Sequence, residues 1–237
     1  MKKNYSILPF FAFLPIIISL VINAFVYVGT RPFTNKLHHY DWSIPLDDRI
    51  PLVTAFMIPY LLAFATWIVG FIVITRENKE VCYSVMTGEQ IAKLICALFF
   101  ILLPTHIIRP EVTGNSFAEL LTKCVYQMDE PNNLFPSIHC LESWIVFRGS
   151  MRCQKVGNKY RVFMFISAII VFLSVLFTKQ HVVVDIFGGI AAVEVGLFVA
   201  EKTKIYNVYY SLQNRVEDIK LFSCLFKQGL ERENKHN

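Results

Sequence analysis

Two residues in the last quarter of the chain have the spacing of a histidine and a carboxylate that orients it. His181 and Asp185 lie four residues apart, so on a helix both would face the same side. The carboxylate could accept a hydrogen bond from one imidazole nitrogen and leave the other free to attack, as in a catalytic triad with histidine as the nucleophile. The same spacing also occurs where the two groups simply satisfy each other at a helix start.

A second histidine closes a short motif, Pro136-Ser137-Ile138-His139. Proline in the first turn and a serine able to cap predict a helix start, where backbone N–H groups and the helix dipole favour an anion. His139 could then protonate a departing alkoxide as a general acid. The simpler interpretation is a capped helix with a histidine at its polar end.

A cation follows the third apolar run, at Arg109. A guanidinium can hold a phosphate through two parallel hydrogen bonds. A lone arginine at the end of a membrane helix, however, often only extends its charged group to the membrane–water interface. Two histidines, a carboxylate and this arginine predict a phosphoryl-transfer site, if the fold brings them together.

Four further side chains are candidates for supporting roles. Lys179 and Ser174 lie close to His181 in sequence and could contact the phosphate. His106 lies one helical turn before Arg109, on the same predicted face. Glu142 lies one turn after His139 and could raise its pKa, or could equally pair with a polar group inside the bundle.

The elements that must position these residues are apolar segments. Hydrophobic residues make up 54% of the 237 residues, and the mean hydropathy is +0.46. A spanning helix needs about 20 apolar residues, and long uninterrupted apolar runs favour helices over a barrel. The fold class we predict is all-α, an integral membrane six-helix bundle. Its predicted spans are residues 7–29, 51–75, 91–108, 137–150, 161–178 and 182–200.

The fourth span is the doubtful one, because Ile138–Phe147 is short and contains Glu142. Charge placement argues for it. The segment Arg148–Arg161 carries five basic residues and no acid, whereas Arg109–Pro136 carries two basic residues against four acids. With six spans, the basic segment is cytoplasmic, as the positive-inside rule requires. Arg109 and His181 then share the outer face, whereas five spans would separate them.

This topology predicts a protein of the cell (plasma) membrane with both termini in the cytoplasm. Residues 1–200 form the membrane domain, with Arg76–Gln90 as a cytoplasmic segment, and residues 201–237 form a cytoplasmic tail. Apolar residues recur in the tail at roughly helical spacing, which suits a helix on the inner leaflet or packed on the cytoplasmic loops. They are Ile219, Phe222, Leu225, Phe226 and Leu230. Gly188, Ala192 and Gly196 form a small-residue stripe that predicts close helix packing.

Charge and cysteine content exclude other classes. The net charge of +5 is modest and unevenly placed, which points to a membrane surface as partner and not to nucleic acid. The six cysteines show no Cys-x-x-Cys pair and no zinc spacing, so small buried hydrophobes are expected. The segment around Tyr40–Asp48 is expected to be an outer loop that caps the site.

Together the motifs resemble the type 2 phosphatidic acid phosphatase and haloperoxidase superfamily. Its signature is Lys-x6-Arg-Pro, then Pro-Ser-Gly-His, then Ser-Arg-x5-His-x3-Asp, and this chain has Arg109-Pro110, Pro136-Ser137-x-His139 and Ser174-x6-His181-x3-Asp185 in that order. The resemblance covers about Leu102 to Gly189, and the six-span layout matches the membrane branch. It implies that His181 forms a phosphohistidine, Asp185 orients it and His139 protonates the leaving group. Arg109 and Ser137 would hold the phosphate, with no metal or cofactor.

The chain departs from that signature at three positions. Leu102 and Val175 stand where the family has a lysine and an arginine, and Ile138 replaces the glycine. Lys179 and His106 could partly substitute for the lost cations. In lacking these two cations, the chain resembles the inositol phosphorylceramide and sphingomyelin synthase-like members of the superfamily. Those enzymes move a phosphodiester headgroup between lipids. Fewer cations suit a diester, with one charge, better than a monoester, with almost two, unless Lys179 restores the charge.

The leading hypothesis is a membrane lipid phosphatase or phosphotransferase that acts on a lipid phosphate or diphosphate at the outer face. Hydrolysis is preferred only by analogy with the superfamily, and headgroup transfer between lipids is the alternative. A non-catalytic lipid-binding or transport protein would use the same polar patches to line a cavity. A zinc site made of His139, His181 and Asp185 is disfavoured, since Arg109 and Lys179 would repel a cation.

Overall fold

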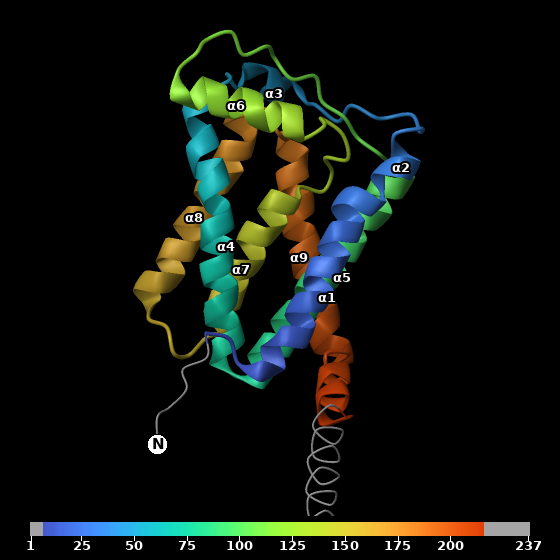
Figure 1. The fold of residues 1–237 in the computed structure, drawn as a ribbon, viewed down its shortest axis with the longest axis vertical. Coiled ribbons are helices and arrows are strands. Elements are labelled where there is room, and N and C mark those ends of the chain that lie inside the picture. The colour runs from blue at the N-terminus through green and yellow to red at the C-terminus, as the bar shows by residue number, and fades with distance from the viewer. Residues whose placement is uncertain (1–6, 216–237) are drawn as a thin grey trace, which may run out of the picture.

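A computed structural model describes residues 7–215, and the apolar residues of the tail from Ile219 onward lie outside this range. The described part is helical, with two isolated bridges and no strand (Figure 1). Its elements are η1 (Phe10–Ala12), α1 (Phe13–Ala24), η2 (Phe25–Gly29), α2 (Arg31–Thr34), α3 (Pro45–Arg49), η3 (Thr54–Phe56), α4 (Met57–Glu77), α5 (Lys79–Leu102), α6 (Phe117–Met128), α7 (Ile138–Arg152), α8 (Asn158–Phe177) and α9 (Val183–Thr203).

Five helical segments are long and apolar enough to cross a membrane. They are Phe10–Thr34, Thr54–Glu77, Lys79–Leu102, Asn158–Phe177 and Val183–Thr203. Each exposes large apolar side chains, such as Leu20, Ile68 and Phe198. Exposed contiguous apolar surface of this extent fits an integral membrane protein, because a lipid environment hides it.

One further helix, α7, packs among these five but is shorter. It has 15 residues, a length of about 22 Å at 1.5 Å per residue, against a hydrocarbon core of about 30 Å. It packs against α4, α5, α8 and α9, and Cys140, Leu141 and Ile145 are fully buried. Neighbouring helices therefore surround α7, so its polar side chains find protein partners instead of lipid.

The predicted third span, Ile91–Ile108, was wrong in its position. The structure places α5 at Lys79–Leu102, so Arg76–Gln90 is mostly helix and belongs largely to the same helix as the third apolar run. The helix begins early because the Asn78 side chain accepts a hydrogen bond from the Val81 N–H, an N-cap. It ends early because the residue before a proline disfavours helical backbone, and Pro104 follows Leu103.

Polar residues inside α5 are paired within the bundle. The Lys93 ammonium contacts Glu89 and lies 2.7 Å from Glu142 of α7. The Ser19 hydroxyl of α1 donates to the Glu89 carboxylate at 2.7 Å. This cluster connects α1, α5 and α7, and within it Glu142 forms an ion pair with Lys93. Of the two roles expected for Glu142, the structure shows the pairing inside the bundle.

Close helix packing occurs where the small-residue stripe predicts it. A Cβ added at Gly196 of α9 would lie 2.2 Å from the Gly88 carbonyl oxygen of α5. Ala192, one turn earlier on α9, is buried. Without side chains at the crossing, α5 and α9 can approach each other closely.

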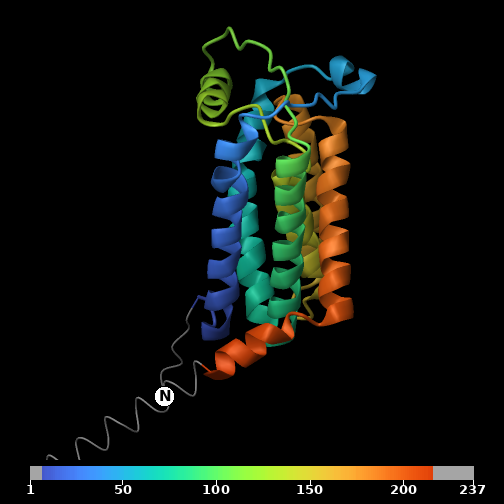
Figure 2. The same ribbon diagram turned by 90° about the vertical axis from the view of Figure 1, so that its right-hand side faces the viewer.

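One end of the bundle is covered by α3, α6 and the loops around them, and we call it the capped end (Figures 1 and 2). Within this cover Tyr40 exchanges backbone hydrogen bonds with Pro104 and His106. The Trp42 ring packs on Phe135 with centroids 4.5 Å apart. At the opposite end, residues 207–215 are helical and Tyr209 donates to Gln90. The basic stretch between α7 and α8 also lies at that opposite end.

Candidate active site

His181 and Asp185 meet at the start of α9, near the capped end. His181 lies in the turn before the helix, so the two residues do not share a helix face as expected. Asp185 nevertheless reaches back, and its Oδ2 lies 3.1 Å from His181 Nδ1 and accepts from the Val182 N–H at 3.1 Å. Asp185 is fully buried. The pair leaves Nε2 as the imidazole nitrogen available for attack.

The loop before α7 and the turn before α9 are joined directly. The Ser137 N–H donates to the Asp185 carbonyl at 3.1 Å, and Ser137 Oγ accepts from the Cys140 N–H as the N-cap of α7. Gly189 permits this contact, because a Cβ there would lie 2.7 Å from the Ser137 carbonyl oxygen. The predicted capping role of Ser137 is confirmed.

His139 lies in the first turn of α7 and faces His181. The ring centroids are 6.1 Å apart, and the His139 ring stacks on Tyr60 at 4.4 Å. His139 Nε2 is buried and has no hydrogen-bond partner among the described residues. Since each nitrogen reaches a reacting group over about 3 Å, one group placed between the rings would contact both.

Arg109 lies in an extended segment, not at the end of a helix. Its guanidinium donates to the side chain of Gln180, next to His181, and to the Asp129 carbonyl at 2.5 Å. The guanidinium carbon also lies 4.8 Å from the centre of the Tyr126 ring. Burial raises the pKa of the Tyr126 phenol, with Arg109 opposing that rise, and the phenol donates to the Thr178 carbonyl at 2.7 Å. These contacts hold Arg109 beside the turn that carries His181.

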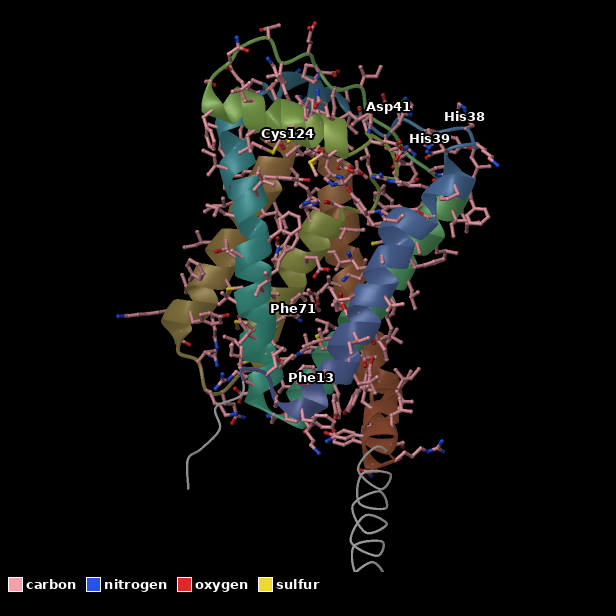
Figure 3. The ribbon with its side chains drawn as sticks, viewed as in Figure 1. Phe13, His38, His39, Asp41, Phe71 and Cys124 are labelled. Atoms are coloured by element: carbon pink, nitrogen blue, oxygen red, sulfur yellow. The ribbon has the colours of Figure 1, made fainter. Side chains whose placement is uncertain are left out.

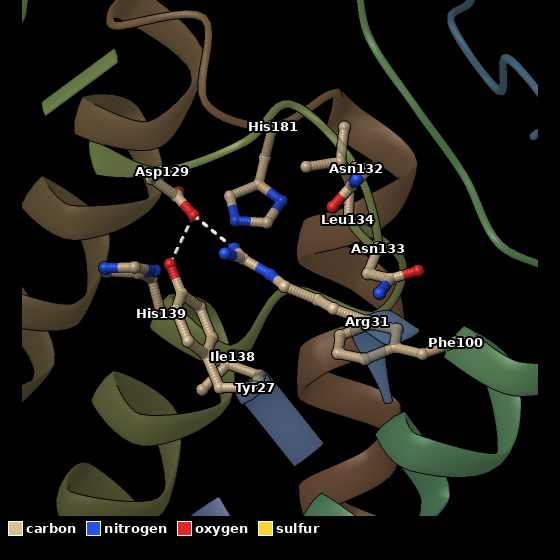
Figure 4. Close-up of a pocket in the computed structure, with 10 residues that line it drawn as sticks. All are labelled: Tyr27, Arg31, Phe100, Asp129, Asn132, Asn133, Leu134, Ile138, His139 and His181. Atoms are coloured by element: carbon tan, nitrogen blue, oxygen red, sulfur yellow. Dashed lines mark hydrogen bonds and ion pairs between the residues drawn. The ribbon is translucent and has the colours of Figure 1, made fainter. Parts of the chain in front are cut away.

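A second arginine, which the sequence did not single out, reaches the same place. Arg31, at the start of α2, lies 2.9 Å from Asp129 Oδ1, and the Tyr27 phenol donates to the same carboxylate oxygen (Figure 4). The sequence contains one signal for it: Arg31-Pro32 follows an apolar run, as Arg109-Pro110 does.

A cavity of about 30 Å³ lies between these groups (Figure 4). Its polar lining includes both histidines, Arg31 and the amide side chains that follow Asp129. The full lining is Tyr27, Arg31, Phe100, Asp129, Asn132, Asn133, Leu134, Ile138, His139 and His181. Figure 4 shows the imidazole of His181 close to the Arg31 guanidinium. Two imidazoles, a guanidinium and the Asp129 carboxylate therefore line one partly open cavity.

Three predicted supporting residues lie elsewhere. The Lys179 ammonium donates to the Asp47 carbonyl of α3 at 2.8 Å, and the buried Ser174 hydroxyl donates to the Ile170 carbonyl in its own helix. His106 is not on a helix with Arg109, because α5 ends at Leu102. These three side chains do not line the cavity that contains the two histidines.

His106 belongs instead to a neighbouring histidine group in the capped end. Its ring lies 6.3 Å from that of His39, and Figure 3 shows His38, His39 and Asp41 together in the loop there. Burial lowers the pKa of His39, and His106 adds to this effect. Residues 7–215 contain no group of three His, Cys, Asp or Glu side chains placed to hold a metal ion.

The loop around Asp47 lies over the start of α9, where a capping loop was expected. Asp47 Oδ1 accepts from the Val183 N–H at 2.8 Å, and Oδ2 accepts from the Ile44 N–H at 2.9 Å. One carboxylate therefore ties α3 to the helix that carries Asp185. The start of α9 is therefore held by two contacts, this one and the hydrogen bond from Ser137 to Asp185.

Comparisons with known proteins add no family assignment. No protein-family model matches the chain, and no curated protein matches it in sequence. A functional argument for this chain therefore depends on its residues and their geometry.

Proposed function

We propose that the chain is a membrane enzyme that transfers the phosphoryl group of a lipid phosphate or diphosphate through a phosphohistidine at His181. The observation that supports this proposal best is the 6.1 Å approach of two histidine rings, one paired with a buried aspartate, beside an arginine-lined cavity. Nucleophile, orienting carboxylate, acid and anion-binding cations are the parts that such a reaction requires.

In the first step Nε2 of His181 attacks phosphorus, and the bond from phosphorus to the lipid oxygen breaks. Asp185 holds Nδ1 and stabilises the charge that the imidazole gains. His139 Nε2 gives its proton to the departing oxygen, so the lipid leaves as a neutral alcohol, or as a phosphate if the substrate is a diphosphate.

In the second step an acceptor oxygen attacks the phosphohistidine. His139, now neutral, removes the proton from a water molecule or an alcohol, and the bond between nitrogen and phosphorus breaks. His181 and His139 return to their starting protonation states. Water as acceptor makes the protein a phosphatase, and a lipid alcohol makes it a transferase.

The anion is held by groups from three parts of the chain. Arg31 and Arg109 supply guanidinium groups, and Ser137 supplies the first turn of α7, where backbone N–H groups favour an anion. Arg31 takes over part of the role of the cations missing at Leu102 and Val175. In this proposal Lys179 and Ser174 support the turn before α9 and do not contact the phosphate.

The proposed orientation has the capped end outside the cell membrane and both termini in the cytoplasm. The basic residues between α7 and α8 lie at the other end of the bundle, where the positive-inside rule places them in the cytoplasm. With α7 as a sixth, short crossing, the two histidines and both arginines face the outer side together. The substrate would be a lipid of the outer leaflet.

The test is a paired assay of the wild-type protein and His181→Ala, purified in detergent. Each is offered a panel of lipid monoesters and diphosphates, and separately a labelled phosphodiester lipid with an acceptor alcohol. We expect turnover by the wild type and none by His181→Ala. Equal turnover by both would reject the phosphohistidine mechanism.

Headgroup transfer from a phosphodiester is the second candidate, and a specific observation favours it: a carboxylate, Asp129, is paired with both arginines. Headgroup exchange without phosphate release would select this version. If neither protein turns over any lipid but the wild type binds them, the non-catalytic lipid-binding alternative replaces both.

A further inference from the structure

The side chain of Asp129 forms part of the anion site itself. It follows α6, and its Oδ1 accepts from the Tyr27 phenol and from Arg31 at 2.9 Å. Its Oδ2 lies 3.6 Å from Arg109. Figure 4 shows the carboxylate at the edge of the cavity, between the two histidines and Arg31. The Tyr27 phenol, Arg31 and Arg109 could each bind a phosphate, but here all three contact the Asp129 side chain.

This carboxylate changes the charge that a phosphate meets. Arg31 and Arg109 contribute two positive charges and Asp129 removes one, which leaves a net charge of about one. In the proposed mechanism two further charges offset each other, because Asp185 is negative beside the neutral, nucleophilic His181 and His139 carries the proton that it gives to the leaving group. Lys179 does not line the cavity, and its ammonium donates to the Asp47 carbonyl. Arg109 donates to the Asp129 carbonyl and to the Gln180 side chain, so it does not leave the carboxylate easily.

We propose that Asp129 is a specificity-determining residue, which makes the site prefer a singly charged phosphodiester headgroup over a doubly charged phosphomonoester. This inference rests on the second candidate under the proposed function, headgroup transfer from a phosphodiester, and assigns that substrate class to the same site.

The physical reason is the balance of charges in a partly open cavity. A phosphodiester carries one negative charge, which the net charge of the site matches. A monoester carries almost two, and its second charge would lie against the carboxylate with no cation left for it. Repulsion between like charges is much stronger in a partly buried site than in water, so the carboxylate selects against the monoester.

The chemistry that follows keeps the same two histidines. Nε2 of His181 attacks the phosphorus of the diester, and the lipid alcohol leaves with a proton from His139. The headgroup stays on phosphorus, bound to the imidazole. An acceptor alcohol then attacks, returns its proton to His139 and takes up the headgroup phosphate, so a diester is consumed and another is formed.

The decisive variant is Asp129→Asn, which keeps the shape of the side chain and removes its charge. We would measure kcat/KM and Kd of the wild type and the variant for short-chain phosphatidylglycerol, a diester, and short-chain phosphatidic acid, a monoester. The wild type should favour the diester. In Asp129→Asn the monoester-to-diester ratio of kcat/KM should rise at least tenfold, and the monoester-to-diester ratio of Kd should fall at least tenfold.

The matched control is Glu130→Gln, which removes the same charge one residue away. Glu130 is exposed and accepts from Asn132 at 2.9 Å and from Asn35 at 3.3 Å. These hydrogen bonds hold the pKa of the Glu130 carboxyl below its usual value, so Glu130→Gln removes a full charge at neutral pH. Glu130→Gln should leave the ratio unchanged. If Asp129→Asn does not fold, Asp129→Ser takes its place.

The binding measurement separates this inference from the proposed function. A shifted Kd ratio in a protein without turnover would reject the enzyme but keep the charge selection at Asp129. Turnover that depends on His181, with a ratio unchanged in Asp129→Asn or equally changed in Glu130→Gln, would overturn the inference and keep the enzyme.

Discussion

At the scale of single residues, the candidate site depends on two guanidinium groups from distant parts of the chain. Arg31 and Arg109 are 78 positions apart in sequence, and both contact Asp129. Arg31 also packs over the Tyr27 ring, with its guanidinium carbon 4.7 Å from the ring centre. Each arginine is therefore held in place by protein groups before any anion binds, which lowers the entropy lost on binding.

Replacing Arg31 by glutamine should weaken substrate binding. A hydrogen bond to a charged group contributes about 1.5–3 kcal/mol, so we expect KM to rise roughly 10- to 100-fold and kcat to fall less. Arg31→Lys should recover part of the loss, because it restores the charge but not the two-pronged geometry. Steady-state kinetics on the best lipid of the panel would measure this.

The control for that variant is Lys36→Gln, which removes an exposed positive charge from the same part of the chain. It should leave KM unchanged. A KM in Arg31→Gln that matches the wild type would remove Arg31 from the anion site.

The sequence predicted the site residues within the three motifs better than it predicted the supporting residues around them. His139, His181, Asp185 and Ser137 meet in space because each stands at a helix start near the same end of the bundle. Lys179, Ser174 and His106 were selected by closeness in sequence, which says nothing of side-chain direction in a turn. Arg31 was missed because its partner Asp129 is far away in sequence.

At the scale of elements, α7 and α9 determine the geometry of the site. The carbonyl of Ser137, just before α7, faces the Cα of Gly189 on α9, and the added Cβ would also lie 3.1 Å from Cys140 Cβ. The distance between His139 and His181 is set by this crossing, since His139 lies two residues beyond Ser137 on α7. A side chain at Gly189 should therefore act on catalysis through the position of α9.

The variant Gly189→Ala should push the two helices apart. Inserting a methyl group into a filled core costs about 1–3 kcal/mol, and we expect kcat to fall at least tenfold with a moderate drop in the unfolding temperature in detergent. The control is Gly157→Ala at the start of α8, where an added Cβ meets nothing within 4 Å. A Gly189→Ala protein as active as Gly157→Ala would show that this crossing does not set the site.

Hydropathy predicted four of the long helices close to their observed positions, but it misplaced the third span. The first half of α5 contains Glu80, Glu89 and Gln90, so its hydropathy is too low to predict a membrane span. In the structure Lys93 and Ser19 pair with Glu89, which the sequence does not show. The helix α7 was expected on charge placement despite its polar residues. Its partners explain them: Glu142 meets Lys93, and Arg148 meets Glu194 at 2.9 Å.

At the scale of the whole molecule, the proposed orientation can be tested with a native cysteine. Cys124 on α6 is exposed at the capped end (Figure 3), whereas Cys82, Cys96, Cys140 and Cys153 are buried. If the capped end is outside, a membrane-impermeant maleimide should label Cys124 in intact cells, and Cys124→Ser should abolish this labelling. Labelling of Cys124 only after permeabilisation would place the candidate site in the cytoplasm.

The central claim is that His181 carries the phosphoryl group during turnover, and trapping this intermediate tests it most directly. Purified protein would be mixed with a lipid substrate labelled in its phosphate or headgroup, denatured at alkaline pH within the first turnover, and mapped by peptide mass spectrometry. We predict the label on His181, slower labelling in His139→Ala, and none in His181→Ala. Turnover without label on His181, or undiminished turnover by His181→Ala, would contradict the account.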